Sequence, residues 1–199
     1  MNERGIYRRV LLGAALGVLL LGGLVYVRKV EPEDVEVVPV SLVLPRLEAR
    51  FDGYRIAQIS DIHADGWMTP GRVLSLVNLV NAEAPDLVTI TGDFATYSRF
   101  RSLIRHATRL VAPLRRLRAP DGVVAVLGNH DHKANPQVVR KVLAASGVTE
   151  LLNTVRTLHR GGAVLHFCGV DDLKEGTPHL DRALEGLSEE GLSTDASTC

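Results

Sequence analysis

Three short segments of this chain carry side chains that bind metal ions, and each follows a run of residues typical of a buried strand. They are Asp61-Ile62-His63, Gly92-Asp93 and Gly128-Asn129-His130-Asp131. Because the carboxyl ends of parallel strands meet at one edge of a sheet, the three segments are expected to converge. Carboxylate, amide and imidazole groups gathered at one point predict a two-metal site for the hydrolysis of phosphate esters.

The spacing within the segments suggests a role for each side chain. On an extended stretch Asp61 and His63 point the same way, so both can bind one cation. Asp93 follows a glycine turn, where a carboxylate can bridge two cations about 3.5–4 Å apart. Asn129 offers a neutral oxygen to the second cation, which leaves His130 free to act on the substrate.

The reaction explains why these residue types are needed. A phosphate ester is anionic and repels a hydroxide nucleophile, whereas two cations neutralise that charge and turn a bridging water into hydroxide near neutral pH. His130 would give a proton to the leaving oxygen, and Asp131 could hold the His130 ring or tune its basicity. Mn, Fe, Zn and Mg all suit such ligands, and we favour Mn.

Strands and helices alternate along the chain, which predicts an α/β fold with a sheet covered by helices on both faces. The strands that end on the three segments are predicted at 55–60, 86–91 and 123–127. Further short strands are predicted at 150–152, 155–159 and 163–170, the last of which should bury Cys168. Helices are predicted from Pro70 to about Ala84, from Phe100 to Leu117 with an interruption near Pro113, and from Pro136 to about Ala145.

The helix predicted at 100–117 is basic. A solvated face is the ordinary explanation for its charges, and a role at a membrane surface or toward an anionic substrate is the alternative. The arginines concerned are Arg101, Arg105, Arg109, Arg115, Arg116 and Arg118.

Composition and the N-terminal region bound the class of protein. The chain has 199 residues with 46% hydrophobic content, enough for one domain with a real core, and its formal net charge of zero does not favour a nucleic-acid partner.

The uncharged run Val10–Val27 is just long enough to span a bilayer and has basic flanks. We expect an uncleaved single-pass anchor in the cell membrane with the rest of the chain outside the cytoplasm, a cleaved signal being the alternative.

The three segments, with their surroundings, also resemble a known family. The chain is similar to the calcineurin-like metallophosphoesterase superfamily, whose motifs are D-x-H, G-D-x and G-N-H-D/E, followed by G-H and G-H-x-H. With Gly169-Val170-Asp171-Asp172, it looks like the membrane-anchored YkuE-type phosphodiesterases, a branch similar to UDP-2,3-diacylglucosamine hydrolases.

This resemblance implies a fold, a site and a substrate class. The fold is a four-layer α-β-β-α sandwich. Asp61 and His63 would bind the first of two divalent metal ions, Asp93 would bridge, Asn129 would bind the second, and His130 would serve the substrate. The substrate would be a phosphodiester or pyrophosphate, with a lipid or a UDP-sugar-lipid of lipid A biosynthesis among the candidates.

The resemblance stops before the last motifs. No G-H or G-H-x-H segment follows Val170, where the remaining histidine is His179. We therefore expect a domain truncated at its C-terminus, weakly active or inactive, with an exposed strand edge and uncovered apolar surface. A non-catalytic, membrane-tethered remnant that binds a metal or a phosphate is the alternative. Ordinary, non-ligand roles are expected for His106, His132, His159 and His166.

The expected organisation follows from these features. It consists of an anchor or uncleaved signal at 1–30, a linker with a first edge strand at 31–50, a partial phosphoesterase domain at 51–187 and a disordered tail at 188–199.

Overall fold

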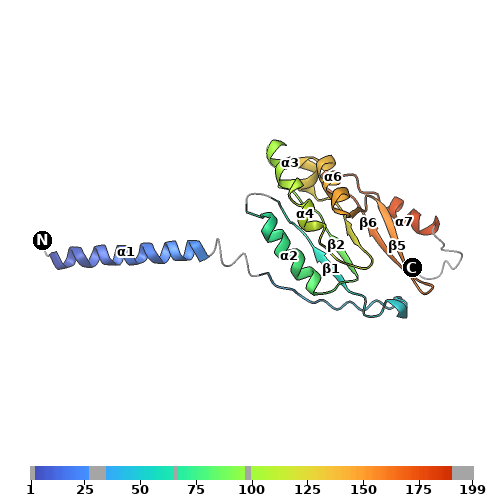
Figure 1. The fold of residues 1–199 in the computed structure, drawn as a ribbon, viewed down its shortest axis with the longest axis horizontal. Helices are drawn as coiled ribbons and strands as arrows, with labels where there is room; N and C mark the ends of the chain where they lie inside the picture. Colours follow the sequence, from blue (N-terminus) through green and yellow to red (C-terminus); the bar gives the residue numbers. More distant parts are fainter. Residues whose placement is uncertain (1–2, 27–34, 65–66, 97–99, 190–199) are drawn as a thin grey trace. The chain divides into compact units, whose positions relative to one another are not determined.

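The computed structural model describes residues 3–26, 35–64, 67–96 and 100–189 (Figure 1). The chain divides into two compact units, Met1–Leu42 and Val43–Cys199. Residues 31–34 of the predicted linker and residues 190–199 of the predicted tail lie outside the described residues.

Among its described residues, the first unit contains helix α1 (Glu3–Val25). In the described part of the chain, no helix combines the length and the apolar character that crossing a membrane requires. The transmembrane helix predicted within 1–30 is thus not found. The edge strand predicted within 31–50 is also missing from described residues 35–50, where a turn leads into a short 3-10 helix, η3 (Ala49–Phe51).

The second unit is built on a four-stranded parallel sheet in the order β1-β2-β3-β4. Ile56 pairs with Leu87, and Val88 pairs with Val123. The apolar runs of the inner strands explain why they are buried on both faces. The strands are β1 (Ile56–Ile59), β2 (Leu87–Ile90), β3 (Val123–Ala125) and β4 (Thr149–Glu150), which confirms the three strands predicted before the metal-binding segments.

Helices cover one face of this sheet, which we call the closed face (Figure 1). They are α2 (Pro70–Ala82), α3 (Phe100–Thr108), α4 (Val111–Leu114) and α6 (Pro136–Ser146). The Thr69 hydroxyl caps α2 by accepting from the Arg72 N–H at 3.4 Å, and Gly147 ends α6 with φ +75°. The predicted interruption of the basic helix is real, but it falls at Arg109–Leu110 rather than at Pro113, which lies inside α4.

Side chains of alternate strand residues build the core of the closed face. Val88 and Ile90 of β2 and Val123 of β3 pack against Val77 of α2 and Val142 of α6, all of them buried. This period of two is the pattern expected of a strand with a different neighbour on each face. The core of the unit therefore lies mainly between the sheet and its helices.

The opposite face, which we call the open face, carries a β-hairpin instead of helices. The hairpin consists of β5 (Thr154–Arg160) and β6 (Ala163–Gly169), paired antiparallel, and α7 (Leu180–Glu189) packs on it. The prediction of helices on both faces of the sheet is therefore wrong. The order of helices, parallel sheet, hairpin and α7 is consistent with the four layers expected, with a two-stranded second sheet.

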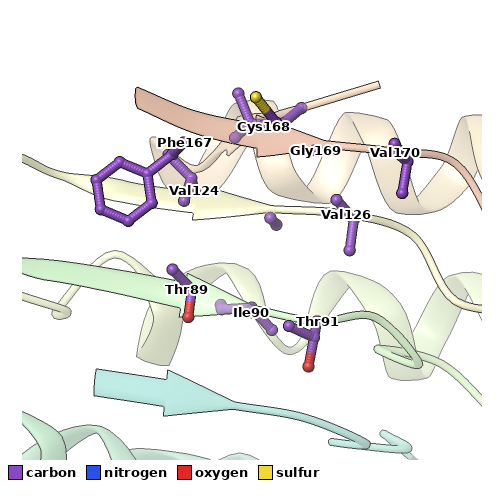
Figure 2. A pocket seen from close by; sticks show the side chains of 11 residues that line it. Thr89, Ile90, Thr91, Val124, Val126, Phe167, Cys168, Gly169 and Val170 are labelled. Carbon is purple, nitrogen blue, oxygen red and sulfur yellow. The ribbon is translucent and has the colours of Figure 1, made fainter. Parts of the chain in front are cut away.

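Apolar packing on the open face is incomplete. Leu87, Val124 and Leu151 form a small buried cluster against Phe167. Beside it lies a cavity of about 270 Å³, and Figure 2 shows side chains such as Val126 at its wall between β3 and β6. The predicted burial of Cys168 is wrong, since Cys168 is exposed on β6.

A polar cluster fixes the hairpin at the end of the sheet where β2 begins. The Arg160 guanidinium donates to Asp86 Oδ1 at 2.9 Å and to Asp121 Oδ2 at 2.8 Å. The Tyr54 hydroxyl donates to the same Asp121 oxygen at 2.8 Å, and the guanidinium lies 4.7 Å from the Tyr54 ring centroid. We call these four residues the Arg160 clamp, because they join the hairpin to the sheet.

Candidate metal centre

Three of the predicted ligands meet at the carboxyl edge of the parallel sheet. His63 Nε2 lies 3.5 Å from Asp61 Oδ1 and 3.6 Å from Asp93 Oδ2. The Asp61 side chain is 63% exposed, whereas that of Asp93 is 12% exposed. The segments that follow β1 and β2 therefore form one cluster, open to solvent on the Asp61 side.

His130 joins this cluster from the segment after β3. Its ring centroid lies 4.8 Å from that of His63, and its backbone N–H donates to Asp93 Oδ1 at 3.0 Å. One ligand atom each from His63, Asp93 and His130 lie within 4.8 Å of one another. Carboxylate and imidazole groups at this spacing suit a divalent cation, so these three side chains could bind one. Asn129 directly precedes His130, and its binding of a second metal stays a prediction.

The Gly-Asn-His-Asp segment forms a short helix that the sequence did not predict. Gly128 is the N-cap of α5 (Asn129–Ala134), and the buried Asp131 carboxylate accepts from the Gly128 N–H at 3.1 Å and from the Ala95 N–H at 3.0 Å. Burial raises the pKa of Asp131, although these hydrogen bonds oppose the shift.

The structure gives the Asp131 carboxylate backbone partners in place of the predicted hold on the His130 ring, and its influence on the basicity of His130 stays a prediction. His130 Nδ1 is buried and has no hydrogen-bond partner in the described residues. Asp131 instead ties the third segment to the chain just after Asp93. A carboxylate three residues after the N-cap is a known capping position, so the spacing of Gly128 and Asp131 is the signal that could have predicted this role.

The backbone is strained where the ligands sit. Asp61, His63 and Asp93 have φ of +54°, +45° and +55°, values that residues with a Cβ rarely adopt. Each costs on the order of 1 kcal/mol and persists because the surroundings hold it. The His63 N–H donates to the Asp93 backbone oxygen at 2.8 Å, which locks the first two segments side by side.

Two glycines let the second and third segments approach closely. A Cβ at Gly92 would lie 2.5 Å from the Gly128 nitrogen, and a Cβ at Gly128 would overlap the Asp93 carboxylate. Gly92 also has φ +96°, which favours glycine. Both positions therefore require glycine if Asp93 is to stand beside α5.

A hydrogen bond from Ser60 keeps Asp61 ionised. The Ser60 hydroxyl donates to Asp61 Oδ2 at 2.5 Å. It is the main reason that the pKa of Asp61 lies below its usual value, with a smaller contribution from His63. An ionised carboxylate is the form that binds a cation.

One contact beside the site was missed by sequence reasoning. His132 Nε2 lies 2.7 Å from Asp171 Oδ1, which joins α5 to the loop after β6. Asn153 supports that loop, because its side-chain oxygen accepts from the Asp171 N–H at 3.1 Å and the His179 N–H at 2.9 Å. His132 is thus a satisfied histidine, as predicted, but no local pattern indicates a partner 39 residues away.

Comparisons with known proteins identify a family for this chain. A family model described as calcineurin-like phosphoesterase matches residues 54–182. The chain is 29% identical over 192 residues to the uncharacterized metallophosphoesterase YkuE of Bacillus subtilis, which covers 95% of the chain and 66% of the relative. The UDP-2,3-diacylglucosamine pyrophosphatase LpxG of Chlamydia trachomatis is 36% identical over 109 residues, which covers 54% of the chain and 32% of LpxG.

A third relative is a transmembrane protein with a metallophosphoesterase domain from Danio rerio. It is 27% identical over 201 residues, which covers 94% of the chain and 44% of the relative. The chain thus spans 66% or less of the length of each of these three proteins.

Proposed function

The chain belongs to the calcineurin-like phosphoesterase family, and on this premise we propose that it is a metal-dependent phosphoesterase. The observation that carries the proposal is the meeting of Asp61, His63, Asp93 and His130 at the carboxyl edge of one parallel sheet. Ligands at that edge are where an α/β fold places its chemistry. The proposed reaction is hydrolysis of a phosphodiester or pyrophosphate bond.

The donor set assigns a place to each of two divalent cations. Asp61 and His63 would hold the first, Asp93 would be shared, and Asn129 would serve the second, with Mn as the metal we favour. When bound, the cations would neutralise the charge of the phosphate and lower the pKa of a coordinated water. Turnover is expected to be weak, because the first cation would have three of these donors and the second would have two.

We assign the proton for the leaving oxygen to the His130 ring. The buried Nδ1 of this ring has no partner in the described residues. The His130 backbone N–H donates to the Asp93 carboxylate, which keeps the residue beside that shared ligand. A ligand role for His130 is the alternative, because its ring nitrogen belongs to the cluster. Metal titration of His130→Gln by calorimetry separates the two: a proton donor loses turnover and keeps metal affinity, whereas a ligand loses both.

We propose further that the substrate carries a lipid, a UDP-sugar-lipid being one candidate. The support is the name of the LpxG relative, a UDP-2,3-diacylglucosamine pyrophosphatase. A location in the cell membrane with the domain outside the cytoplasm belongs to the same proposal. It rests on the uncharged run Val10–Val27 and on the transmembrane relative, while no helix among the described residues is long and apolar enough to support it. Carbonate extraction of membranes checks the location.

The central test combines metal binding with turnover. The full chain is titrated with MnCl₂ by calorimetry, and hydrolysis of bis(p-nitrophenyl) phosphate is followed with and without Mn²⁺. We expect Mn-dependent turnover that falls at least about 100-fold in Asp93→Asn. Loss of a residue that only hydrogen-bonds to a metal ligand already lowers metal affinity or activity about 10–100-fold. Asp52→Asn, an exposed aspartate on η3's C-cap, is the matched control and should match the wild type.

Two outcomes would overturn the proposal. Tight Mn²⁺ binding without turnover would establish the non-catalytic binding module. Turnover that is independent of metal and of Asp93 would place the reaction elsewhere.

A further inference from the structure

Exposed arginines gather beside the candidate metal centre, at the same edge of the sheet. Between Asp93 and Asp121 the chain has seven arginines and no acidic residue, although its overall net charge is zero. Arg105 of α3 and Arg109, which directly follows α3, are exposed, and within the described residues neither is joined to an acidic group by an ion pair. The local positive charge is therefore not neutralised within this part of the molecule.

Part of this charge lies next to the loop that follows His63. Arg109, His106 and Leu110 line one side of a small hollow whose other side is Met68 and Pro70. Ala64, the first residue after His63, forms a bridge with Ala95, which follows the second metal-binding segment, and Ala64 also lines the hollow. Arg109 and the metal cluster thus share one edge of the sheet.

Two exposed apolar side chains belong to the same segments as these residues, Trp67 next to Met68 and Ile104 next to Arg105. Trp67 is 47% exposed and Ile104 is 38% exposed. The Arg72 guanidinium lies 4.5 Å from the centroid of the Trp67 ring. We call the group Trp67, Arg72, Ile104, Arg105 and Arg109 the arginine rim.

Arg116 and Arg118 of this stretch belong to a different place. The Asn81 side chain, at the far end of α2, donates to the Arg116 oxygen at 2.7 Å and accepts from the Arg118 N–H at 2.8 Å. Arg116 and Arg118 therefore lie at the opposite end of α2 from Pro70 and Trp67, outside the rim.

We propose that the arginine rim binds the surface of an anionic phospholipid bilayer and brings the metal centre to that surface. Guanidinium groups pair with lipid phosphates, and tryptophan with an aliphatic side chain enters the headgroup region. Charge with exposed apolar side chains in one patch fits a lipid surface better than a nucleic acid, which needs no aliphatic contact. The inference concerns binding and does not require that the chain be a phosphoesterase.

The chain offers a direct probe, because Trp67 is its one tryptophan. Its fluorescence reports on the rim and not on α1, which has no tryptophan. The full chain is mixed with vesicles of phosphatidylcholine, alone or with 30% phosphatidylglycerol. With the anionic vesicles we expect a blue shift of the Trp67 emission, quenching by brominated acyl chains, and weakening of both by high salt.

Charge reversal at the rim is the decisive variant. Arg105→Glu/Arg109→Glu should lower the affinity for anionic vesicles at least about tenfold, since each basic residue near such a surface contributes substantially. Arg46→Glu/Arg182→Glu changes the charge equally at exposed arginines on other elements and should keep the blue shift. If circular dichroism shows that the rim variant is unfolded, Arg105→Gln/Arg109→Gln replaces it.

Three results would overturn the proposal. An equal blue shift with neutral vesicles would show that charge plays no part. An equal loss in both charge-reversed variants would remove the rim as the binding surface. A shift of the same size with a single-stranded oligonucleotide at equal phosphate concentration would assign the rim to nucleic acid. Turnover of bis(p-nitrophenyl) phosphate without lipid is measured in parallel, so failure of the rim and failure of the enzyme are seen separately.

Discussion

The two faces of the parallel sheet are held by different forces. On the closed face, buried side chains from α2, α3, α4 and α6 form one continuous core with the strands. On the open face, three buried residues contact the hairpin, and a cavity of about 270 Å³ lies beside them. A second small apolar cluster of Phe51, Leu158 and Ala163 also packs on the hairpin. Polar contacts hold the hairpin at both ends, the Arg160 clamp at one and His132 with Asp171 at the other.

This difference matters because the metal-binding segments directly follow the strands of the sheet, and contacts on both faces of the sheet hold those strands in place. Apolar packing depends little on pH or salt, whereas ion pairs at partly exposed positions depend on both. The closed face should therefore set the stability of the unit. The open face should respond to conditions and tolerate changes in the size of its side chains.

Matched valines on the two faces give the largest expected contrast. Val88 of β2 is fully buried in the closed core, and its change to alanine should cost about 2 kcal/mol, from lost burial and the space left behind. Val126 borders an existing cavity, so Val126→Ala should cost less than about 1 kcal/mol. Urea denaturation of both variants measures the free energies of unfolding. Equal costs would contradict the difference between the faces.

Removal of one hydroxyl tests the clamp. The Tyr54 hydroxyl donates to Asp121 at 2.8 Å, and the pKa of Tyr54 is raised by burial and by this carboxylate. Tyr54→Phe should therefore lower the free energy of unfolding by about 1 kcal/mol, the usual value of such a hydrogen bond. Tyr26→Phe changes an exposed tyrosine of the other unit and serves as the control. An unchanged free energy of unfolding in Tyr54→Phe would mean that this hydrogen bond of the clamp adds no stability.

Added volume should have opposite signs on the two faces. Val126→Ile places one more methylene at the cavity and should stabilise the unit by up to about 0.8 kcal/mol. Val88→Ile forces the same group into a filled core and should cost about 1 kcal/mol. Thermal denaturation followed by circular dichroism ranks the two variants against the wild type. A gain in stability for Val88→Ile would show that the closed core is not full.

The sequence predicted the closed face better than the open face, for a physical reason. The strands before Asp61, Asp93 and Gly128 are short apolar runs, and the helix at Pro70 has a hydroxyl cap and a proline at its first position, so local signals suffice. The hairpin strands were also recognised from their residues. Their place on one face of the sheet depends on contacts such as Arg160 with Asp86, 74 residues apart.

The candidate site shows the same division. The residue types at strand ends predicted the meeting of Asp61, His63 and Asp93, because parallel strands bring their carboxyl ends together. The sequence did not predict α5, since its six residues carry no apolar pattern and its Asp131 carboxylate is held by the Ala95 N–H, far away in the sequence. The left-handed backbone at the ligands was equally hidden, because no glycine occupies those positions.

Acid should loosen the open face before the closed face. Asp86 accepts from the Arg55 N–H at 2.8 Å and from Arg160, and these contacts hold its pKa below the ordinary value of 3.8. A depressed carboxyl pKa stabilises the folded chain above 3.8, and this contribution is lost as the pH falls through the lower folded value.

Asp86→Asn should therefore lose some stability at pH 7 and show a smaller fall in Tm between pH 5 and pH 3 than the wild type. The effect is small because Asp86 is partly exposed. Asp52→Asn, outside the clamp, should keep the wild-type fall in Tm. If Asp86→Asn also keeps the wild-type fall in Tm, the acid sensitivity of the chain lies outside the clamp. The polar contacts of the open face would then not govern the response of that face to pH.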